Sequence, residues 1–402
     1  MAKHTQQAIY IVGTGDTKRQ ELEFLRERVV DSDALAVVVD VGIHSDGSGA
    51  DFSPGEVASH HPRQQIILGT DDRGEAVSAM GEALVEFFNA RDDIGGVLGI
   101  GGSGGTAIIA PAMQQLGIGV PKLIVSTVAS GDVGPYVGPS DICMMNSVTD
   151  LAGLNRISRE ILANAAGAIC GMVSRATIAK GVDKPALGLT MFGVTTPLVS
   201  NLVEALENEF DALVFHATGT GGQSMEKLAG SESLYAVLDM TTTEVSDHLF
   251  GGVLSAGPGR LDAIAASRIP YVGSCGALDM VNFGPKDTVP EAYKNRKLYV
   301  HNPFITLMRT TAEENEAQGV WIAEKLNRCE GPVRFLLPTG GVSMIDAPGQ
   351  AFHDPEADEA LFSALERTFQ ASENRQLRRI PHHINDDNFA QAVLEAFREV
   401  TA

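Results

Sequence analysis

Three glycine-rich segments in the first half of the sequence bring small residues together with hydroxyl, carboxylate and ammonium groups. They lie at 13–18, 101–106 and 127–131, and each follows a short apolar run. Glycine lets a backbone approach a ligand closely, and the exposed N–H groups that begin a helix attract anions. These segments therefore predict a phosphate-binding site built from backbone amides and hydroxyl groups, with Lys18 supplying positive charge.

The nucleotide-binding residues that we predict come from these segments and from the end of a further apolar run at 35–39. They are Gly13, Thr14, Asp16, Thr17, Lys18, Asp40, Gly42, Gly101, Gly102, Ser103, Gly104, Gly105, Thr106, Thr127, Ala129 and Gly131. A carboxylate in such a site, here Asp16 or Asp40, is expected to bind a magnesium ion or a ribose hydroxyl. The alternative is that each segment is a tight turn between a strand and a helix, which needs only small residues.

The residues at 102–107 also match the pattern GxGxxA, which occurs in dinucleotide-binding sites. Those sites are expected to have an acidic residue at the end of the next strand, and here that strand ends at Ser126 and Thr127. This mismatch disfavours NAD, and the sequence also lacks a P-loop of the form GxxxxGK[ST]. The histidine pairs at 60–61 and 382–383 do not form a zinc-binding pattern, so no metal site made of side chains alone is predicted.

Polar residues at predicted strand ends make the second half a candidate catalytic region. His216 precedes a glycine-rich turn, where a general base would be well placed, and Cys275 lies where a helix N-terminus lowers the pKa of a thiol. Glu244 lies on the loop after the next strand, and Arg309 is expected to help form a pocket for a carboxylate or phosphate. Structural alternatives stay open for all four: a histidine bonded to a carbonyl, a buried cysteine, a solvated carboxylate and a capping arginine.

The composition is that of a globular protein with a strongly acidic surface. The chain has 402 residues, of which 44% are hydrophobic and 20% charged, and its formal net charge is −21. This charge argues against binding to nucleic acids or anionic membranes, so an anionic ligand needs local amides and helix ends. The four cysteines lack CxxC spacing, which fits a reduced cytoplasm, and no apolar run has the length of a signal peptide or a membrane span.

Apolar runs of strand length alternate with helical patterns throughout the sequence. Strands are expected near 8–12, 35–39, 96–100 and 123–127, and again near 186–191, 212–215, 235–238, 271–272 and 333–337. This alternation predicts an α/β fold with two Rossmann-like, doubly wound parallel-sheet domains facing a cleft. Residues 180–185 have the composition of a linker, so the predicted domains are 1–182, with the nucleotide site, and 183–402, with the substrate site.

The ordered set of glycine-rich turns resembles a known family. The turns are GTGDTK at 13–18, DVG at 40–42, GGSGGT at 101–106, STVASG at 126–131, HATGTGG at 216–222, GPGR at 257–260, GSCG at 273–276 and PTGG at 338–341. They span nearly the whole chain and resemble an uncharacterised bacterial and fungal family that includes the ATP-binding inhibitory domain of the tomato tobamovirus-resistance protein. The resemblance implies two Rossmann-like subdomains, ATP bound with magnesium in the first, and a homodimer or larger homo-oligomer. The antiviral role and the further barrel domain of the plant protein are not expected here.

Together these features predict a cytoplasmic ATP-binding protein. We expect an enzyme of small-molecule metabolism that holds a small polar substrate in the interdomain cleft. One alternative is a nucleotide-binding regulator or interaction protein without catalysis. Another is a hydrolase or lyase that acts through the second domain, with the first site vestigial or occupied by a CoA-like group.

Overall fold

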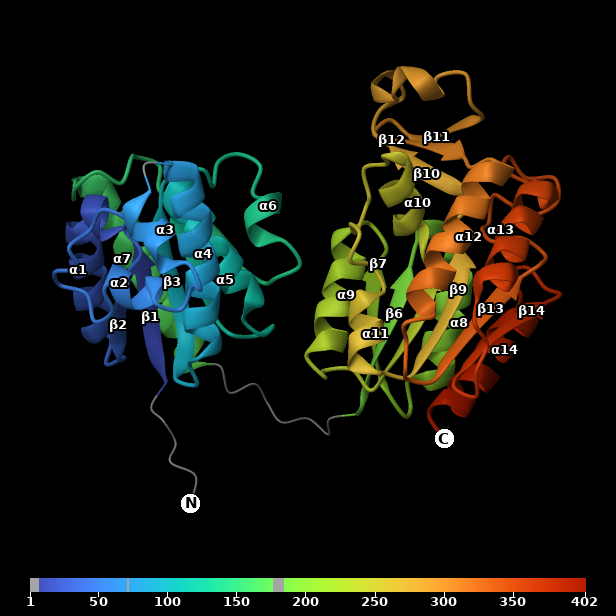
Figure 1. Ribbon diagram of the computed structural model, residues 1–402, viewed down its shortest axis with the longest axis horizontal. Helices are drawn as coiled ribbons and strands as arrows, with labels where there is room; N and C mark the ends of the chain where they lie inside the picture. The colour runs from blue at the N-terminus through green and yellow to red at the C-terminus, as the bar shows by residue number, and fades with distance from the viewer. Residues whose placement is uncertain (1–6, 71, 176–183) are drawn as a thin grey trace. The chain divides into compact units, whose positions relative to one another are not determined.

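The computed structural model describes residues 7–70, 72–175 and 184–402, which form two compact units on either side of residues 176–183 (Figure 1). We call them unit 1 and unit 2 in chain order. The predicted domain boundary between residues 182 and 183 lies outside the described residues. Each unit has a parallel β-sheet with helices on both faces, which confirms the Rossmann-like α/β fold expected from the sequence.

Unit 1 has a five-stranded parallel sheet in the order β2-β1-β3-β4-β5. Its elements are β1 (Ala8–Gly13), α1 (Gly15–Val30), β2 (Ala36–Asp40), α2 (Pro54–Ala58), α3 (Gln64–Gly69), α4 (Arg73–Asn89), β3 (Ile94–Gly101), α5 (Ser103–Gln115), β4 (Lys122–Ser126), α6 (Gly134–Val137), β5 (Cys143–Asn146) and α7 (Arg156–Ser174). Every residue of β1 is buried, because helices cover both faces of the sheet.

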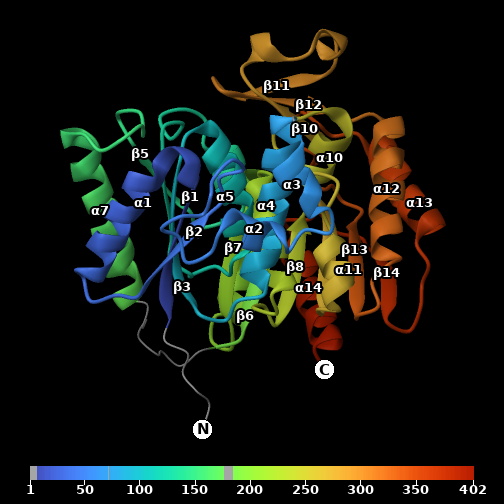
Figure 2. The ribbon, with the colours of Figure 1, turned by 60° about the vertical axis from the view of Figure 1, so that its left-hand side comes forward.

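The two faces of the unit 1 sheet carry separate layers of helices. On one face α1 and α7 pack through residues such as Leu25 and Leu162, and on the other α2 to α5 pack through residues such as Leu84 and Ile109. Figure 2 shows α1 and α7 on one side of the strands and α4 and α5 on the other. The apolar residues of α1 recur at the three- and four-residue spacing that places them on one helical face.

The strand order of unit 1 determines where a ligand can bind. From β1 the chain crosses to β2 on one side and then returns to β3 on the other side of β1. The connections that leave β1 and β3 therefore diverge, and a crevice forms at the carboxyl ends of these two strands. Two of the predicted glycine-rich turns, at 13–18 and 101–106, follow these strands.

Unit 2 has a six-stranded parallel sheet in the order β14-β13-β9-β8-β6-β7 and a separate three-stranded antiparallel sheet in the order β10-β12-β11. Its strands are β6 (Ala186–Met191), β7 (Asp211–His216), β8 (Ala236–Thr241), β9 (Tyr271–Gly276), β10 (Met280–Phe283), β11 (Leu298–Asn302), β12 (Ile305–Arg309), β13 (Val333–Pro338) and β14 (Arg375–Ile380). Its helices are η1 (Gly193–Thr195), α8 (Thr196–Leu206), α9 (Thr220–Gly230), α10 (Thr243–Phe250), α11 (Asp262–Ser267), η2 (Lys286–Thr288), η3 (Glu291–Tyr293), α12 (Ala312–Leu326), α13 (Pro355–Thr368) and α14 (Asp387–Val400).

The large sheet of unit 2 is also covered on both faces. Helices α9, α11, α12 and α13 pack on one face, and α8 and α14 pack on the other. The small antiparallel sheet, which Figure 1 shows beside α10, was not predicted from the sequence. Polar residues such as Asn282 and His301 interrupt these strands, so they lack the continuous apolar run that marks β2, which is of similar length.

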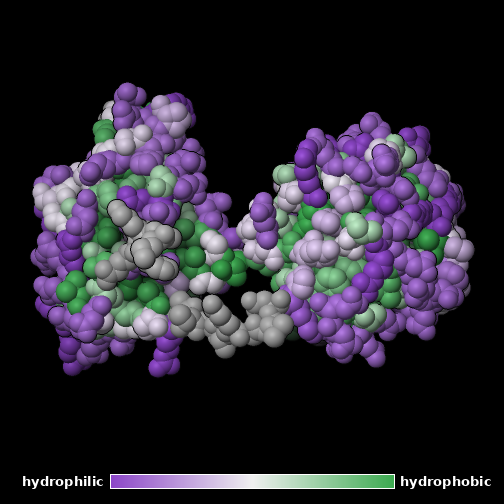
Figure 3. All heavy atoms as spheres, turned by 90° about the horizontal axis from the view of Figure 1, so that it is seen from below, coloured by the Kyte–Doolittle hydropathy of each residue, from purple (hydrophilic) through white to green (hydrophobic). Residues whose placement is uncertain are grey.

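Hydrophilic side chains cover most of the face drawn in Figure 3, with smaller hydrophobic areas between them. Among the described residues, no helix has both the length and the apolar character needed to cross a membrane.

The close packing of α12 on α13 depends on Gly319. A Cβ atom there would lie 2.7 Å from the Leu361 carbonyl oxygen. We therefore expect Gly319→Ala to lower the free energy of unfolding by about 1–3 kcal/mol. Chemical denaturation followed by fluorescence of Trp321, the single tryptophan, measures this change. Gly230→Ala in α9 is the control, since its nearest neighbour would lie 3.9 Å away; equal stabilities of the two variants would contradict the packing.

Candidate functional site

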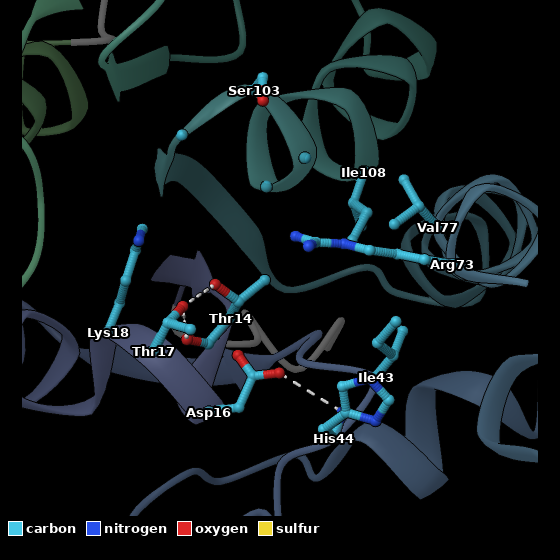
Figure 4. A pocket seen from close by; sticks show the side chains of 13 residues that line it. Thr14, Asp16, Thr17, Lys18, Ile43, His44, Arg73, Val77, Ser103 and Ile108 are labelled. Carbon is cyan, nitrogen blue, oxygen red and sulfur yellow. Dashed lines mark hydrogen bonds between the residues drawn. The ribbon is translucent and has the colours of Figure 1, made fainter. Parts of the chain in front are cut away.

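A cleft of about 320 Å³ lies at the crevice between β1 and β3 of unit 1, where α1, α4 and α5 begin (Figure 4). This volume suits a small-molecule ligand. The lining residues are Thr14, Asp16, Thr17, Lys18, Ile43, His44, Arg73, Val77, Gly102, Ser103, Gly104, Gly105 and Ile108.

The buried Asp40 carboxylate fixes the turn that follows β1. Its Oδ1 atom accepts hydrogen bonds from the Gly15 N–H at 2.7 Å and from the Gly42 N–H at 2.8 Å, and its Oδ2 atom accepts one from the Ser45 hydroxyl. A Cβ atom on Gly15 would lie 2.2 Å from Asp40 Oδ2, so this position requires glycine. Asp40 therefore holds the start of α1 against the turn after β2, and it does not line the cleft.

The turn between β3 and α5 presents backbone amides to the cleft. Residues 102–105 line the cleft, and Gly102, the N-cap of α5, has no side chain that could bond the first N–H groups. Because these N–H groups also lack intrahelical partners and lie at the positive end of the helix dipole, they can bind an anion. Gly101 allows the turn to close tightly, since a Cβ atom there would lie 2.7 Å from the Thr106 nitrogen.

Lys18 brings positive charge to the cleft from α1. Its side chain is buried, and Nζ donates a hydrogen bond to the Leu151 carbonyl oxygen at 3.0 Å. One turn later, Glu21 accepts a hydrogen bond from the Gly153 N–H at 2.7 Å, so α1 holds the 151–153 segment at two points. The ammonium group has three protons, and the bond to Leu151 leaves others for a ligand.

Arg73 brings a second cation from α4. Its guanidinium group extends across the cleft toward the first turn of α5 (Figure 4), and a Cβ atom on Gly104 would lie 3.8 Å from Arg73 Nη2. The guanidinium forms no hydrogen bond or ion pair with any residue that the structure describes. Val77 lies one helical turn later and, with Ile43 and Ile108, provides an apolar wall.

Asp16 is the acidic residue that lines the cleft. Its side chain is exposed, and Oδ2 accepts a hydrogen bond from the His44 N–H at 3.4 Å. The Thr14 and Thr17 hydroxyl groups lie beside it, 2.9 Å apart. Oxygen groups of this kind suit magnesium, which often binds one or two carboxylates together with phosphate oxygens. Within the described ranges, no group of three or more histidine, cysteine, aspartate or glutamate side chains could hold a metal ion.

The structure brings part of the predicted nucleotide-binding set into the cleft. The predicted residues that line it are Thr14, Asp16, Thr17, Lys18, Gly102, Ser103, Gly104 and Gly105. Those that do not line it are Gly13, Asp40, Gly42, Gly101, Thr106, Thr127, Ala129 and Gly131. Thr106 is fully buried with its hydroxyl 2.7 Å from that of Ser126, so it joins α5 to β4. The 127–131 segment forms its own turn, in which the Gly131 N–H donates to the Val128 carbonyl.

Sequence reasoning missed the lining residues outside the glycine-rich turns. They are Ile43, His44, Arg73, Val77 and Ile108. Ile43 and His44 directly follow the predicted Gly42, so extending that segment identifies them. Arg73 and Val77 carry no such signal, because α4 reaches the cleft through its packing against α5.

In unit 2 a carboxylate of the protein itself fills the glycine-rich turn before α9. Glu244 Oε1 accepts hydrogen bonds from the Gly219 N–H at 2.7 Å and the Gly222 N–H at 3.0 Å, and Oε2 accepts one from Arg260 at 2.9 Å. Three buried carboxylates pair with this guanidinium: Glu226, Asp239 and Glu244. Burial raises the pKa of Glu244, and the Arg260 charge opposes this shift. Glu244 therefore occupies the position at α9 that a bound anion would need.

The other predicted catalytic residues lie in separate surroundings. His216 is exposed at the end of the edge strand β7, with its ring centroid 5.4 Å from that of Phe192. Arg309 is 3% exposed and pairs with Asp346 at 3.3 Å and Asp358 at 2.7 Å. In the part of the chain that the structure describes, no hydrogen bond or ion pair joins any two of the four predicted catalytic residues.

Cys275 is a core residue of unit 2. Its side chain is fully buried, and this burial raises the pKa of the thiol well above its usual value. A buried, protonated thiol is a poor nucleophile, so its surroundings favour the structural alternative over the predicted catalytic role.

Alkylation tests this interpretation. We expect iodoacetamide at neutral pH to modify the exposed Cys143 first, and the buried Cys275 and Cys329 only after unfolding. Mass spectrometry of the peptides over time measures each rate, and Cys143→Ser should remove the fast reaction. Rapid modification of Cys275 in the folded protein would contradict its assignment to the core.

Both units match known domain families. Residues 7–177 match the N-terminal domain, and residues 184–401 the C-terminal domain, of the uncharacterised protein family UPF0261. A UPF0261 protein of Rhizobium meliloti is 56% identical over 98% of each chain, and one of Clostridium tetani is 46% identical over 96% of each chain. The tomato protein named ToMV resistance protein Tm-1 is 42% identical over the whole of this chain, which spans 56% of that protein. The chain therefore belongs to the uncharacterised protein family UPF0261 and contains both of its domains.

Proposed function

We propose that this chain is an ATP-binding protein whose nucleotide site is the cleft between β1 and β3 of unit 1. The observation that carries the proposal is the meeting of Lys18 and Arg73 with the first amides of α5 in one cleft. Neither cation pairs with a carboxylate among the described residues, although the chain has a formal net charge of −21. Unpaired cations beside a helix N-terminus suit a ligand with several negative charges.

The rest of the cleft also suits a nucleotide. The hydroxyl groups of Thr14, Thr17 and Ser103 can donate hydrogen bonds to phosphate oxygens. The apolar side chains of Ile43 and Ile108 can pack against the face of a base. A site with one polar and one apolar part thus matches the two parts of a nucleotide.

Asp16 fits the magnesium ion that accompanies ATP. Its exposed carboxylate lies beside two threonine hydroxyl groups, and these groups would hold the ion together with the phosphates. Magnesium would neutralise part of the phosphate charge, which otherwise repels the Asp16 carboxylate.

The hydrogen bonds that Asp40 accepts within the protein favour ATP over NAD as the ligand. In dinucleotide sites, a carboxylate at the end of the second strand binds the ribose hydroxyl groups. Asp40 has this place at the end of β2, but its oxygens accept hydrogen bonds from Gly15, Gly42 and Ser45. The choice of ATP among the remaining nucleotides follows the resemblance to the tomato ATP-binding domain.

The surroundings of the predicted catalytic residues in unit 2 favour a regulatory role for ATP over a hydrolase or lyase activity of that unit. Glu244, Cys275 and Arg309 are buried, and the two charged residues have partners within the protein. His216 is exposed, but none of the other three residues bonds to it. A nucleotide-binding regulator is therefore the second candidate function that we retain beside an ATP-dependent enzyme.

Calorimetric titration of ATP and magnesium tests nucleotide binding directly. We expect Lys18→Met, which keeps most of the buried stem, to weaken ATP binding about 10- to 100-fold through loss of a charge-assisted hydrogen bond. Lys286→Met, at an exposed position in unit 2, is the control and should bind like the wild type. Absence of ATP binding, or tighter binding of NAD or CoA, would contradict the proposal.

A further inference from the structure

We propose that Arg73 determines the ligand class of this cleft by binding the phosphate that the first turn of α5 holds. The site then recognises the polyphosphate of a nucleotide and does not distinguish its base. This inference rests on the proposed function and adds to it a residue outside every glycine-rich turn.

The Arg73 guanidinium group lies beside the N-terminus of α5. Figure 4 shows the Arg73 side chain reaching from α4 into the space between the Ser103 turn and Thr14. Nη2 lies 3.8 Å from the place of a Cβ atom on Gly104, so the group is next to the amides that begin α5. An anion bound to those amides would therefore lie within reach of Arg73.

Arg73 has no hydrogen-bond or ion-pair partner among the described residues. Several arginines of unit 1 pair with carboxylates, such as Arg19 with Asp46 and Arg26 with Asp51. Others, such as the exposed Arg63, form no ion pair with a described residue, but Arg73 differs from them because it lines the cleft. Asp72, the neighbour of Arg73, instead accepts hydrogen bonds from the Gly74 and Glu75 N–H groups and caps α4. In this acidic chain, a cation directed into a cleft without a carboxylate partner among the described residues points to an anionic ligand.

The two cations of the cleft, Lys18 and Arg73, differ in how they can bind an anion. The ammonium group of Lys18 is a point charge that is already bonded to the Leu151 carbonyl. The guanidinium group of Arg73 is planar and can donate two parallel hydrogen bonds to a phosphate. Arg73 is therefore the group that can distinguish a phosphate from a smaller or less charged anion.

A base in the cleft would meet a mostly aliphatic wall. Ile43, Val77 and Ile108 have no hydrogen-bonding side-chain atoms, and His44 is the polar lining residue beside Ile43. Strong discrimination between bases requires polar groups that are left unpaired by the wrong base. The aliphatic residues cannot provide this, and the one imidazole ring of His44 can either donate to or accept from any base, so adenine, guanine and cytosine nucleotides should bind with similar affinity.

The test compares ligands with and without a base. Calorimetry with magnesium would measure ATP, GTP, CTP and inorganic triphosphate binding to the wild type, Arg73→Gln and Arg73→Lys. We expect Arg73→Gln to weaken all four ligands by the same factor, about 10- to 100-fold. Arg73→Lys should cause a smaller loss of affinity, because lysine keeps the positive charge but cannot donate two parallel hydrogen bonds to a phosphate. Arg63→Gln is the matched control, because Arg63 is exposed in the same unit and does not line the cleft.

The outcomes separate this inference from the proposed function. If Arg73→Gln weakens ATP but not triphosphate, or leaves both unchanged, the assignment of Arg73 to the phosphate is wrong while ATP binding stands. A preference for ATP over GTP of more than about 100-fold would likewise overturn it. If the wild type binds neither ATP nor triphosphate, both proposals fail. Circular dichroism and thermal unfolding of each variant would check the fold, which we expect to be kept because Arg73 is exposed.

Discussion

The hydrogen bonds from the Gly15 and Gly42 amides to the Asp40 carboxylate fix the geometry on which the cleft depends. A buried carboxylate is costly unless its oxygens accept hydrogen bonds, and Asp40 meets this need by joining the turns after β1 and β2. The same contact makes glycine obligatory at residue 15, because a Cβ atom would collide with Asp40. The Thr14 hydroxyl and the Asp16 carboxylate then face the cleft from a backbone that is already held in place. The turn after β3 completes the site from the other side of the crevice with amides that have no acceptor among the described residues.

A buried carboxylate also bonds to the amides of a glycine-rich turn in unit 2, but there it fills the place that a bound anion would need. There Glu244 bonds to the amides of Gly219 and Gly222, and Arg260 balances its charge. The glycine-rich turn before α9 resembles the one before α5 in sequence, yet its N–H groups bond to Glu244, whereas those that begin α5 have no carboxylate partner in the described ranges. The two units therefore share an architecture but offer different chemistry at corresponding turns, and the phosphate-binding proposal concerns unit 1 alone.

Much of the fold could be predicted from the sequence because buried parallel strands are continuous apolar runs, such as those of β1 and β3, and glycine-rich turns mark their carboxyl ends. The antiparallel strands β10 to β12 escaped prediction because polar residues interrupt their apolar residues, so none of them is a continuous apolar run. In the cleft, Ser103 and Thr14 lie where the motifs predicted. The partners of Asp40 and Glu244 were not predictable, because a carboxylate in a turn has the same sequence signature whether it binds a ligand or the backbone. Arg73 was missed because tertiary packing, and not local sequence, brings α4 to the cleft.

The central claim is that the first turn of α5 binds the phosphates of ATP, and amide hydrogen exchange tests it most directly. Exchange would be measured on the full chain with and without saturating ATP and magnesium, at the residues that begin α5 and at the turn before α9. The account predicts that ATP slows exchange at residues 103–105, because their N–H groups gain phosphate acceptors, and leaves the Gly219 and Gly222 amides, already bonded to Glu244, unchanged. Unchanged exchange at residues 103–105 when ATP is bound, or slowing confined to unit 2, would contradict the account.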